Sequence, residues 1–595
     1  MTQDHAPRLQ ALRTALDAAG LDGFILPRGD EHLGEYVAAG SERLAWLTGF
    51  TGSAGLAIVL PGKAAVFSDG RYTLQLAEQT DGALWSRQHL IEHPPEAWLA
   101  ENADGLARIG YDPWLMSPDT LARFEARLKA AGIALVPVQP NPLDALWTDR
   151  PPPPLQPARP HALELSGRDS ADKRHQIAGV LRAAGEQALV LTDPASVAWL
   201  LNIRGADVPF TPLALGFAIL RDDESVILFM HPAKLDADMR QWLGNTVQAE
   251  PPEALPGQIA ALAGQTVRVD AGGSAVWFAQ GLRAAGATVG TGPDPVLLAK
   301  SRKNAVELAG ARSAHHRDGI ALCGFLHWLD GHGVGLTEMA LAARLDAFRA
   351  ASPLYRGESF PAISGSGPNG AIIHYRVSPE TDRTLEADEI YLIDSGAQYP
   401  DGTTDVTRTI WSGPGPAAAS VRDHFTRVLR GHVAIAATCF PQGATGGRLD
   451  SLARAPLWAA GLDYDHGTGH GIGSFLSVHE GPCSIHPRNQ GVPLEPGMIL
   501  SDEPGYYRTG AYGIRLENLL LVQAAAPLAD AQTRMFLEFE TLTLAPFDRR
   551  LIETALLHEP ERRWIDRYHA RVLSEIGPEL DPAACSWLQA ACAPL

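Results

Sequence analysis

Five residues in the C-terminal half of the chain have the types that ligate a pair of divalent metal ions. They are four carboxylates and one imidazole: Asp394, Asp405, His470, Glu503 and Glu517. A carboxylate beside an apolar strand is costly to bury unless it is paired or bound to a metal, and four together would repel one another. Two cations would neutralise this charge, and oxygen-rich ligation with one imidazole suits Mn²⁺, Co²⁺ or Zn²⁺. Two such ions about 3.5 to 4 Å apart activate a shared water and polarise a carbonyl, as peptide hydrolysis requires.

A predicted β-hairpin positions the first two carboxylates. Asp394 ends the apolar run 390–393, and Asp405 opens the β-rich run 405–410. The intervening segment 396–402 contains two glycines and suits a hairpin turn. We therefore expect the two carboxylates to face each other near the strand ends.

A second pair of strands is predicted around Glu503 and Glu517. Glu503 follows the apolar run 498–500, and Glu517 lies just before the apolar run 519–522. Between them, Tyr506, Gly510 and Gly513 favour a turn. Both glutamates are therefore expected at the ends of paired strands.

The histidine ligand lies in the glycine-rich segment 466–471. His466 and His470 have the H-x-x-x-H spacing of helical zinc proteases, but the three glycines of this segment oppose a helix. The glutamate of that motif is also absent. A helical zinc-protease site is therefore rejected.

Two further patterns are interpreted as structural. Residues 365–370 fit G-x-G-x-x-G, but residues 371–375 after them look like a strand, whereas a dinucleotide site requires a helix there. Cys483 lies near His479, and it is interpreted as a buried thiol rather than a nucleophile. Neither pattern adds a cofactor or a second catalytic centre.

The chain is predicted to contain three domains. The prolines of segment 151–154 form a stiff linker. The same order of predicted elements occurs once before this linker and once after it: a helix, a strand, the tripeptide Ala-Trp-Leu and a second strand. The tripeptide lies at 45–47 and at 198–200. This repetition indicates two related α/β domains in tandem. The predicted domains are 1–155, 156–300 and 301–595, the last with a C-terminal tail from about residue 547.

The third domain is predicted to be α+β. Ser301 is expected to cap a helix that begins near Lys303, and Thr337 is expected to open a second helix. Further helices are expected near 416–440 and 446–460, between β-branched strands.

Composition excludes several classes of protein. The formal net charge is −19, which disfavours nucleic acid and anionic membranes as partners. The apolar runs are shorter than a membrane span, and residues 1–20 lack the apolar core of a secretory signal. Five irregularly spaced cysteines indicate free thiols in a reducing compartment. A cytoplasmic protein is expected.

Motifs along the whole chain resemble those of the Xaa-Pro aminopeptidases in their long, three-domain cytosolic form. In the third domain these motifs are 359–376, 391–399, 401–409, 466–471, 478–482, 501–505 and 513–518. The first domain adds 29–32, 49–55 and 69–72, and the middle domain adds 199–208. The resemblance implies two creatinase-type N-terminal domains followed by a pita-bread catalytic domain, in a homodimer. It also implies hydrolysis of the N-terminal Xaa-Pro bond of peptides with proline in second position, releasing the first amino acid.

The resemblance also implies roles for individual residues. The five candidate ligands would hold two ions, usually Mn²⁺, with Glu503 also accepting a proton from the attacking water. His374 would stabilise the tetrahedral intermediate, His479 would bind the substrate, and His466 would line the same pocket. Arg71 and Arg515 are implied as substrate-binding residues.

Alternatives of other classes remain open at this level. Prolidase uses the same five ligands but cleaves only dipeptides, and the additional domain favours the aminopeptidase. Creatinase shares the fold without this ligand set. Some pita-bread domains are non-catalytic binding modules in histone chaperones, and these have lost metal ligands. A soluble scaffold without activity is the remaining alternative.

Overall fold

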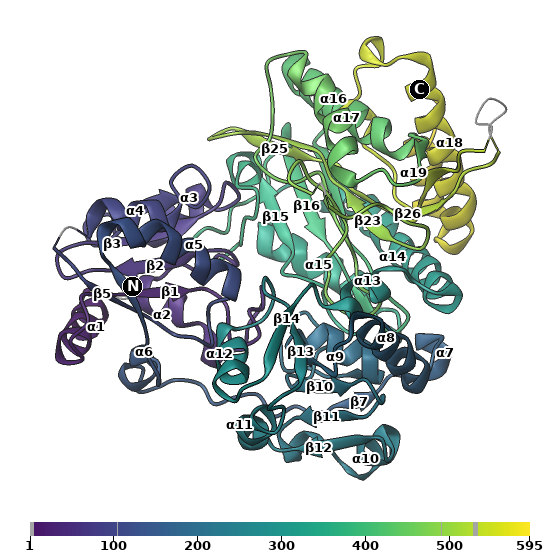
Figure 1. The fold of residues 1–595 in the computed structure, drawn as a ribbon. Helices are drawn as coiled ribbons and strands as arrows, with labels where there is room; N and C mark the ends of the chain where they lie inside the picture. The colour runs from purple at the N-terminus through teal and green to yellow at the C-terminus, as the bar shows by residue number, and fades with distance from the viewer. Residues whose placement is uncertain (1–4, 104, 490, 528–532) are drawn as a thin grey trace. The chain divides into compact units, whose positions relative to one another are not determined.

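The computed structural model describes residues 5–103, 105–489, 491–527 and 533–595. The chain folds into two units, one formed by Met1–Ala162 and Arg168–Leu297 and the other by Leu163–Gly167 and Leu298–Leu595. Figure 1 labels many of their helices and strands. Each unit is described separately below. Among the helices of the described ranges, none is both long and apolar enough to cross a membrane.

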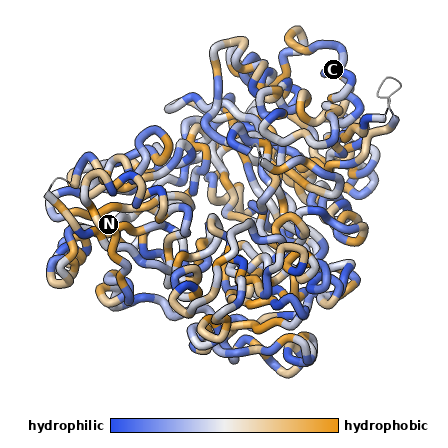
Figure 2. The backbone as a smooth tube through the Cα atoms, viewed as in Figure 1, coloured by the Kyte–Doolittle hydropathy of each residue, from blue (hydrophilic) through white to orange (hydrophobic). Residues whose placement is uncertain are grey.

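The first unit begins with a six-stranded sheet in the order β4-β3-β2-β1-β5-β6. Its strands are β1 (Gly23–Pro27), β2 (Leu56–Val59), β3 (Ala64–Ser68), β4 (Ser86–His89), β5 (Arg108–Tyr111) and β6 (Ala134–Pro137). Its helices are α1 (Ala6–Ala18), α2 (Arg43–Thr48), α3 (Thr73–Gln79), α4 (Pro95–Asn102), α5 (Pro118–Leu128) and α6 (Pro142–Leu146). Phe24, Ile25 and Leu26 on β1 are fully buried, and Figure 2 shows the strands of this sheet as largely hydrophobic.

The same unit contains a second six-stranded sheet in the order β12-β11-β10-β8-β13-β14. Its strands are β8 (Ala188–Leu191), β10 (Phe217–Arg221), β11 (Val226–Phe229), β12 (Val247–Glu250), β13 (Thr266–Val269) and β14 (Thr288–Thr291). Its helices are α8 (Ser170–Ala184), α9 (Pro194–Leu201), α10 (Ala237–Leu243), α11 (Leu255–Ala260) and α12 (Val276–Ala284), and β7 (Arg159–Pro160) pairs with β9 (Ile203–Arg204).

The two sheets have the same topology. The first strand of each pairs antiparallel with the next strand, β2 or β10, and parallel with β5 or β13. The two Ala-Trp-Leu elements lie in α2 and α9, which follow β1 and β8. The predicted tandem repeat is therefore confirmed. The proline-rich segment 151–158 between the sheets forms neither helix nor strand.

The helices of the second unit range from 4 to 28 residues. They are α7 (Leu163–Ser166), α14 (Ala305–His332), α15 (Glu338–Ala350), α16 (Ala419–Ala436), α17 (Gly446–Trp458), α18 (Glu559–Ile576) and α19 (Pro582–Ala591), and α13 (Pro295–Ser301) crosses the boundary between the units. Helix α16 contributes Phe425 and Leu429 to the same buried cluster as Tyr391 and Ile393. The predicted helices near 416–440 and 446–460 are thus confirmed.

One predicted helix start is wrong and another is correct. Ser301 is the last residue of α13, and its hydroxyl donates to Leu298 O at 2.9 Å. The cap of α14 is Asn304, which exchanges side-chain hydrogen bonds with Glu307 in a capping box. The sequence contains this capping box. It is a stronger helix start than a single serine because it satisfies the backbone amides of both Asn304 and Glu307. Thr337 does cap α15, accepting from Ala340 N at 3.3 Å.

The strands of the second unit form small sheets and hairpins. Strands β15 (Ile363–Ser366), β16 (Glu389–Ser395) and β19 (Val406–Ser412) form one sheet, and β20 (Phe440–Pro441), β27 (Phe536–Thr541), β26 (Asn518–Ala524) and β23 (Ile499–Asp502) form another. The two-stranded pairs are β17 (Gln398–Tyr399) with β18 (Gly402–Thr403), β21 (Gly469–His470) with β22 (Ser484–Ile485), and β24 (Gly505–Arg508) with β25 (Tyr512–Arg515).

The segment after β15 differs from its prediction. Residues 371–375 are not a strand, because Gly367–Ala371 form the short 3₁₀ helix η5 and a turn follows. Gly367 has a positive φ of 48°, which turns the chain out of the sheet. Asn369 and Tyr375 then bind the buried carboxylate of Glu338. These tertiary contacts outweigh the β propensity of the isoleucines.

Candidate metal centre

The hairpin that carries Asp394 and Asp405 is confirmed. Strand β16 pairs antiparallel with β19, and the register places Asp394 opposite Thr407. Asp405 precedes β19 by one residue, so both carboxylates lie at the same end of the pair. The turn between them is extended by β17 and β18.

The second strand pair is also confirmed. Strand β23 pairs antiparallel with β26, with Asp502 opposite Asn518. Glu503 and Glu517 are therefore the residues just beyond the paired ends, and β24 and β25 form the predicted turn between them. The amide of Glu517 donates to Thr407 O at 3.2 Å, which joins this pair of strands to the hairpin that carries Asp394 and Asp405.

The glycine-rich segment 466–471 also lies beside these strand ends. Its residues Gly469 and His470 form a strand, not a helix. In β21, the His470 amide donates to Ser501 Oγ at 2.9 Å. A Cβ on Gly469 would lie 1.9 Å from Ser501 O, and one on Gly471 would lie 2.1 Å from Glu480 O. Only glycine permits this close approach of the backbones. The two glycines thus allow the imidazole to enter the carboxylate cluster.

The side chains of the cluster lie within metal-ligand range of one another. Ligand atoms of Asp405, His470 and Glu517 all lie within 4.8 Å of each other. His470 Nε2 is 3.5 Å from Asp405 Oδ2 and also 3.5 Å from Glu503 Oε1. Asp394 is connected to this group through Arg515, whose Nη2 donates to Asp394 Oδ2 at 2.6 Å.

The electrostatics of the cluster fit a cation site. Burial raises the pKa of Asp405 well above its ordinary value, and Glu517, Asp394 and Glu503 raise it further by repulsion. The pKa of Glu517 is raised in the same way, by burial and then by Asp394 and Glu503. Asp394 Oδ1 and Glu517 Oε1 are buried without a hydrogen-bond donor among the described residues. Oxygen atoms in this state are suited to bind metal ions.

The same carboxylates predict how stability depends on pH without metal. Burial raises the pKa of Glu503 from 4.5 to about 7. A carboxyl with a raised pKa in the folded state binds its proton more tightly there, so its stabilising contribution is complete below pH 4.5 and is lost as the pH rises through 7. In EDTA, we expect Tm to fall by about 5 °C or more across this interval.

Calorimetry at several pH values, with EDTA and with saturating Mn²⁺, measures this dependence. Mn²⁺ should abolish the decline, because a cation stabilises the ionised carboxylates. A Tm that rises with pH in EDTA over this interval would contradict the assignment.

Arg515 is buried behind the cluster. Its side chain is 2% exposed, and the guanidinium contacts Asp394, Thr407 and Tyr507. Thr407 Oγ1 in turn donates to Glu517 Oε2 at 2.7 Å. These contacts orient two candidate ligands, so Arg515 is placed to act on the carboxylates themselves.

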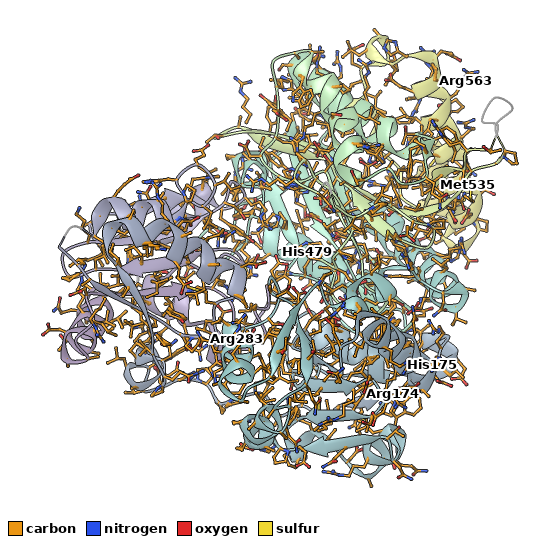
Figure 3. All side chains as sticks on the ribbon, viewed as in Figure 1. Arg174, His175, Arg283, His479, Met535 and Arg563 are labelled. Atoms are coloured by element: carbon orange, nitrogen blue, oxygen red, sulfur yellow. The ribbon has the colours of Figure 1, made fainter. Side chains whose placement is uncertain are left out.

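Two of the three predicted catalytic histidines contact residues of the cluster or its neighbours, and the third follows a residue that does. The ring of His479, marked in Figure 3, is perpendicular to that of His470 with centroids 4.4 Å apart. His466 Nε2 is 2.9 Å from Tyr507 Oη, which accepts from Arg515. His374 follows Ile373, whose carbonyl accepts from Arg515 Nη1 at 3.3 Å.

Arg71 lies in the first unit rather than in the unit that contains the cluster. Its guanidinium donates to both carboxylate oxygens of Asp69, at 3.0 and 2.8 Å. Its predicted role in substrate binding stays a prediction.

Three supporting residues were not singled out from the sequence. Ser501 lies two positions before Glu503, so strand alternation could have placed it beside that carboxylate. Thr407 binds Glu517, which is distant in sequence, so local pattern could not have found that contact. Ser501 Oγ donates to Glu503 Oε1 at 3.2 Å. Tyr507, which joins His466 to Arg515, has no such pattern around it, and its role arises from tertiary contacts alone.

Family models match nearly the whole chain. Residues 8–146 and 149–307 each match a creatinase/prolidase N-terminal domain. Residues 309–524 match metallopeptidase family M24, and residues 535–595 match the C-terminal region of peptidase M24. The expected fold is thereby confirmed as two creatinase-type domains followed by a pita-bread domain.

Full-length relatives identify the branch of this family. Aminopeptidase P1 of Lotus japonicus is 38% identical, with 99% of each chain covered. A probable Xaa-Pro aminopeptidase P of Laccaria bicolor is 38% identical, covering 100% of this chain and 94% of its own. The structure of X-prolyl aminopeptidase from Caenorhabditis elegans, a cytosolic enzyme with a di-nuclear active site, matches with a TM-score of 0.94 at 34% identity and covers 100% of both chains. The chain therefore belongs to the Xaa-Pro aminopeptidase P family of M24 metallopeptidases.

Proposed function

We propose that this protein is a metalloaminopeptidase that hydrolyses the first peptide bond of substrates with proline in second position. The observation that carries the proposal is the convergence of Asp405, His470 and Glu517, with Asp394 and Glu503 adjoining, in a chain similar over its full length to such enzymes. A solvated set of acidic residues would not be buried together in this way.

The cofactor is a pair of divalent ions held by the five ligands, with Mn²⁺ as the first candidate and Co²⁺ and Zn²⁺ as alternatives. When bound, the ions supply Lewis acidity toward the scissile carbonyl and lower the pKa of water. The donor set supports hard cations, because it contains four carboxylates and one imidazole and no thiolate.

Proton transfer, stabilisation of the oxyanion and substrate binding are assigned to individual residues of the site. Glu503 accepts the proton of the attacking water, and His374 donates a hydrogen bond to the developing oxyanion. His479 and His466 bind the substrate in the same pocket. Arg515 orients Asp394, and substrate binding is assigned to Arg515 and Arg71 through the family resemblance alone.

This site suits a bond that other proteases cleave poorly. The peptide bond before proline is a tertiary amide without an N–H. A protease that binds its substrate through a hydrogen bond from that N–H therefore loses a contact. Binding the free amine of the substrate beside the ions instead restricts cleavage to the first residue.

Prolidase and non-catalytic binding modules are the competing functions. A prolidase would cleave dipeptides and leave a tripeptide such as Arg-Pro-Pro intact. A binding module would contain no metal and would release no amino acid.

One experiment separates these functions. The purified protein is analysed for metal and assayed with Arg-Pro-Pro, before and after chelation and after restoring Mn²⁺. The proposal expects about two ions per chain and release of arginine that chelation abolishes and Mn²⁺ restores. Metal-free, inactive protein would refute it, and activity confined to dipeptides would reassign it to prolidase.

We further propose a cytosolic homodimer with domains at 1–155, 156–300 and 301–595. The cytosolic location is supported by the description of the C. elegans enzyme and by the five free cysteines. Sedimentation equilibrium tests the dimer, and limited proteolysis near residues 155 and 300 tests the domains.

A further inference from the structure

A buried carboxylate outside the metal centre requires an explanation. Glu338 is the first residue of α15, and its exposed fraction is 0%. A helix N-terminus favours an acidic side chain, but a charge removed from water still costs several kcal/mol unless hydrogen bonds satisfy it.

The donors to Glu338 come from one loop and from the two residues that flank it. Oε1 accepts from the Ser366 amide at 2.6 Å and from the Ser366 hydroxyl at 2.9 Å. Oε2 accepts from Asn369 Nδ2 at 2.9 Å, from Tyr375 Oη at 2.9 Å and from the Arg383 amide at 3.2 Å. The carboxylate is therefore fully satisfied, and its partners lie between Ser366, the last residue of β15, and Arg383, which precedes β16.

These contacts close the loop at its base and hold its middle. We call residues 367–382 the His374 loop. Ser366 precedes the loop and Arg383 follows it, and the amide of Glu338 donates to Arg383 O at 2.9 Å. Tyr375 is the neighbour of His374. One carboxylate thus holds the start, the middle and the end of the loop.

The other side of the loop is fixed by the metal centre. Arg515 binds both Ile373 O and Asp394. A Cβ on Gly513 would lie 1.7 Å from Gly370 O, so the loop packs directly on the backbone of β25. The backbone of His374 is consequently held between Glu338 on one side and the residues that orient Asp394 on the other.

We propose that Glu338 is a positioning residue that holds His374 in its catalytic orientation. The inference rests on the proposed function, because Glu338 acts on the reaction only through His374. The hydrogen-bond partners of the carboxylate are Ser366, Asn369, Tyr375 and Arg383, and none of these is a candidate metal ligand. A displacement of about 1 Å at a catalytic group lowers a rate by up to about 100-fold, which is the size of effect that the loss of this anchor can produce.

Glu338→Gln tests the proposal with minimal change in shape. Glutamine keeps one acceptor oxygen but replaces the other with an NH₂ group, which faces the donors Asn369 Nδ2 and Arg383 N, so part of the anchor is lost. We expect kcat toward Arg-Pro-Pro to fall by about 10- to 100-fold while KM stays within about threefold. Metal content should be unchanged, and hydrogen exchange of amides 371–376 should be faster. Glu186→Gln, which removes a buried ion pair with Arg268 in the middle sheet, is the matched control and should leave kcat unchanged.

A double-mutant cycle with His374→Ala separates positioning from general destabilisation. In the His374→Ala background, Glu338→Gln should change kcat by less than about twofold, because the group that it positions is already absent. If Glu338→Gln does not fold, Tyr375→Phe is the substitute, because it removes one donor to the same carboxylate. It should lower kcat by a smaller factor in the wild type and should not change kcat in the His374→Ala background.

The outcomes are distinct. Unchanged kcat in the single variant, or an equal loss in both backgrounds, would overturn the role of Glu338 and leave the proposed function intact. A wild-type protein that fails to cleave Arg-Pro-Pro would refute the proposed function before any Glu338 variant is made, and the inference would fall with it.

Discussion

Replacing Asp405 with asparagine is expected to lower kcat/KM toward a Xaa-Pro peptide by about 1,000-fold or more. Asp405 lies within ligand distance of His470 and Glu517, and burial, followed by repulsion from three neighbouring carboxylates, raises its pKa. An amide would retain the shape but lose the charge that the cations neutralise. Metal analysis should show fewer than two ions per chain.

The same substitution should have opposite effects on stability with and without metal. In EDTA the variant is expected to have a Tm about 2–4 °C above wild type, because one repelling carboxylate is gone. With saturating Mn²⁺ the order should reverse, since the wild type gains more free energy from binding. Asp330→Asn, at a half-exposed ion pair with Arg550, is the control and should match wild type in both conditions. An Asp405 variant that keeps two ions and full activity would remove Asp405 from the ligand set.

Replacing His374 with alanine is expected to lower kcat by about 100- to 1,000-fold and to change KM by less than about threefold. In the proposed mechanism the imidazole donates to charge that develops in the transition state, whereas the ions and the other histidines bind the substrate in its ground state. Steady-state kinetics with Arg-Pro-Pro measures both constants. The metal content should remain at the wild-type value.

A matched histidine provides the control for this measurement. His332→Ala on α14 removes an exposed imidazole that contacts Trp328 O, and it should leave both constants unchanged. If His374→Ala retained the wild-type kcat, His374 would have no part in the mechanism, and Glu338 would lose its proposed purpose as well.

The architecture explains why ligands so distant in sequence converge. Two antiparallel strand pairs each end in two carboxylates, and the amide of Glu517 bonded to Thr407 O brings the two ends together. Backbone pairing thereby supplies the precision that the metal centre needs, and the glycines around His470 let the fifth ligand approach.

Local pattern was sufficient for some of this structure. Alternation and turn residues predicted the hairpin of Asp394 and Asp405 and the strand pair of Glu503 and Glu517, because strand pairing across a short turn is decided by nearby residues. Local pattern was insufficient where capping or tertiary contacts overrode it. Asn304 rather than Ser301 caps α14, and residues 371–375 form a turn instead of a strand.

The amino-acid sequence by itself determined the candidate ligands, the tandem α/β repeat and the family resemblance, since these depend on residue type and local order. Only the tertiary structure decided how the two carboxylate pairs meet, that Arg515 lies buried against Asp394, and that Glu338 holds the His374 loop. The reason is physical: each of these contacts joins residues from separate elements, and a buried charge acquires its partners only when those elements pack together.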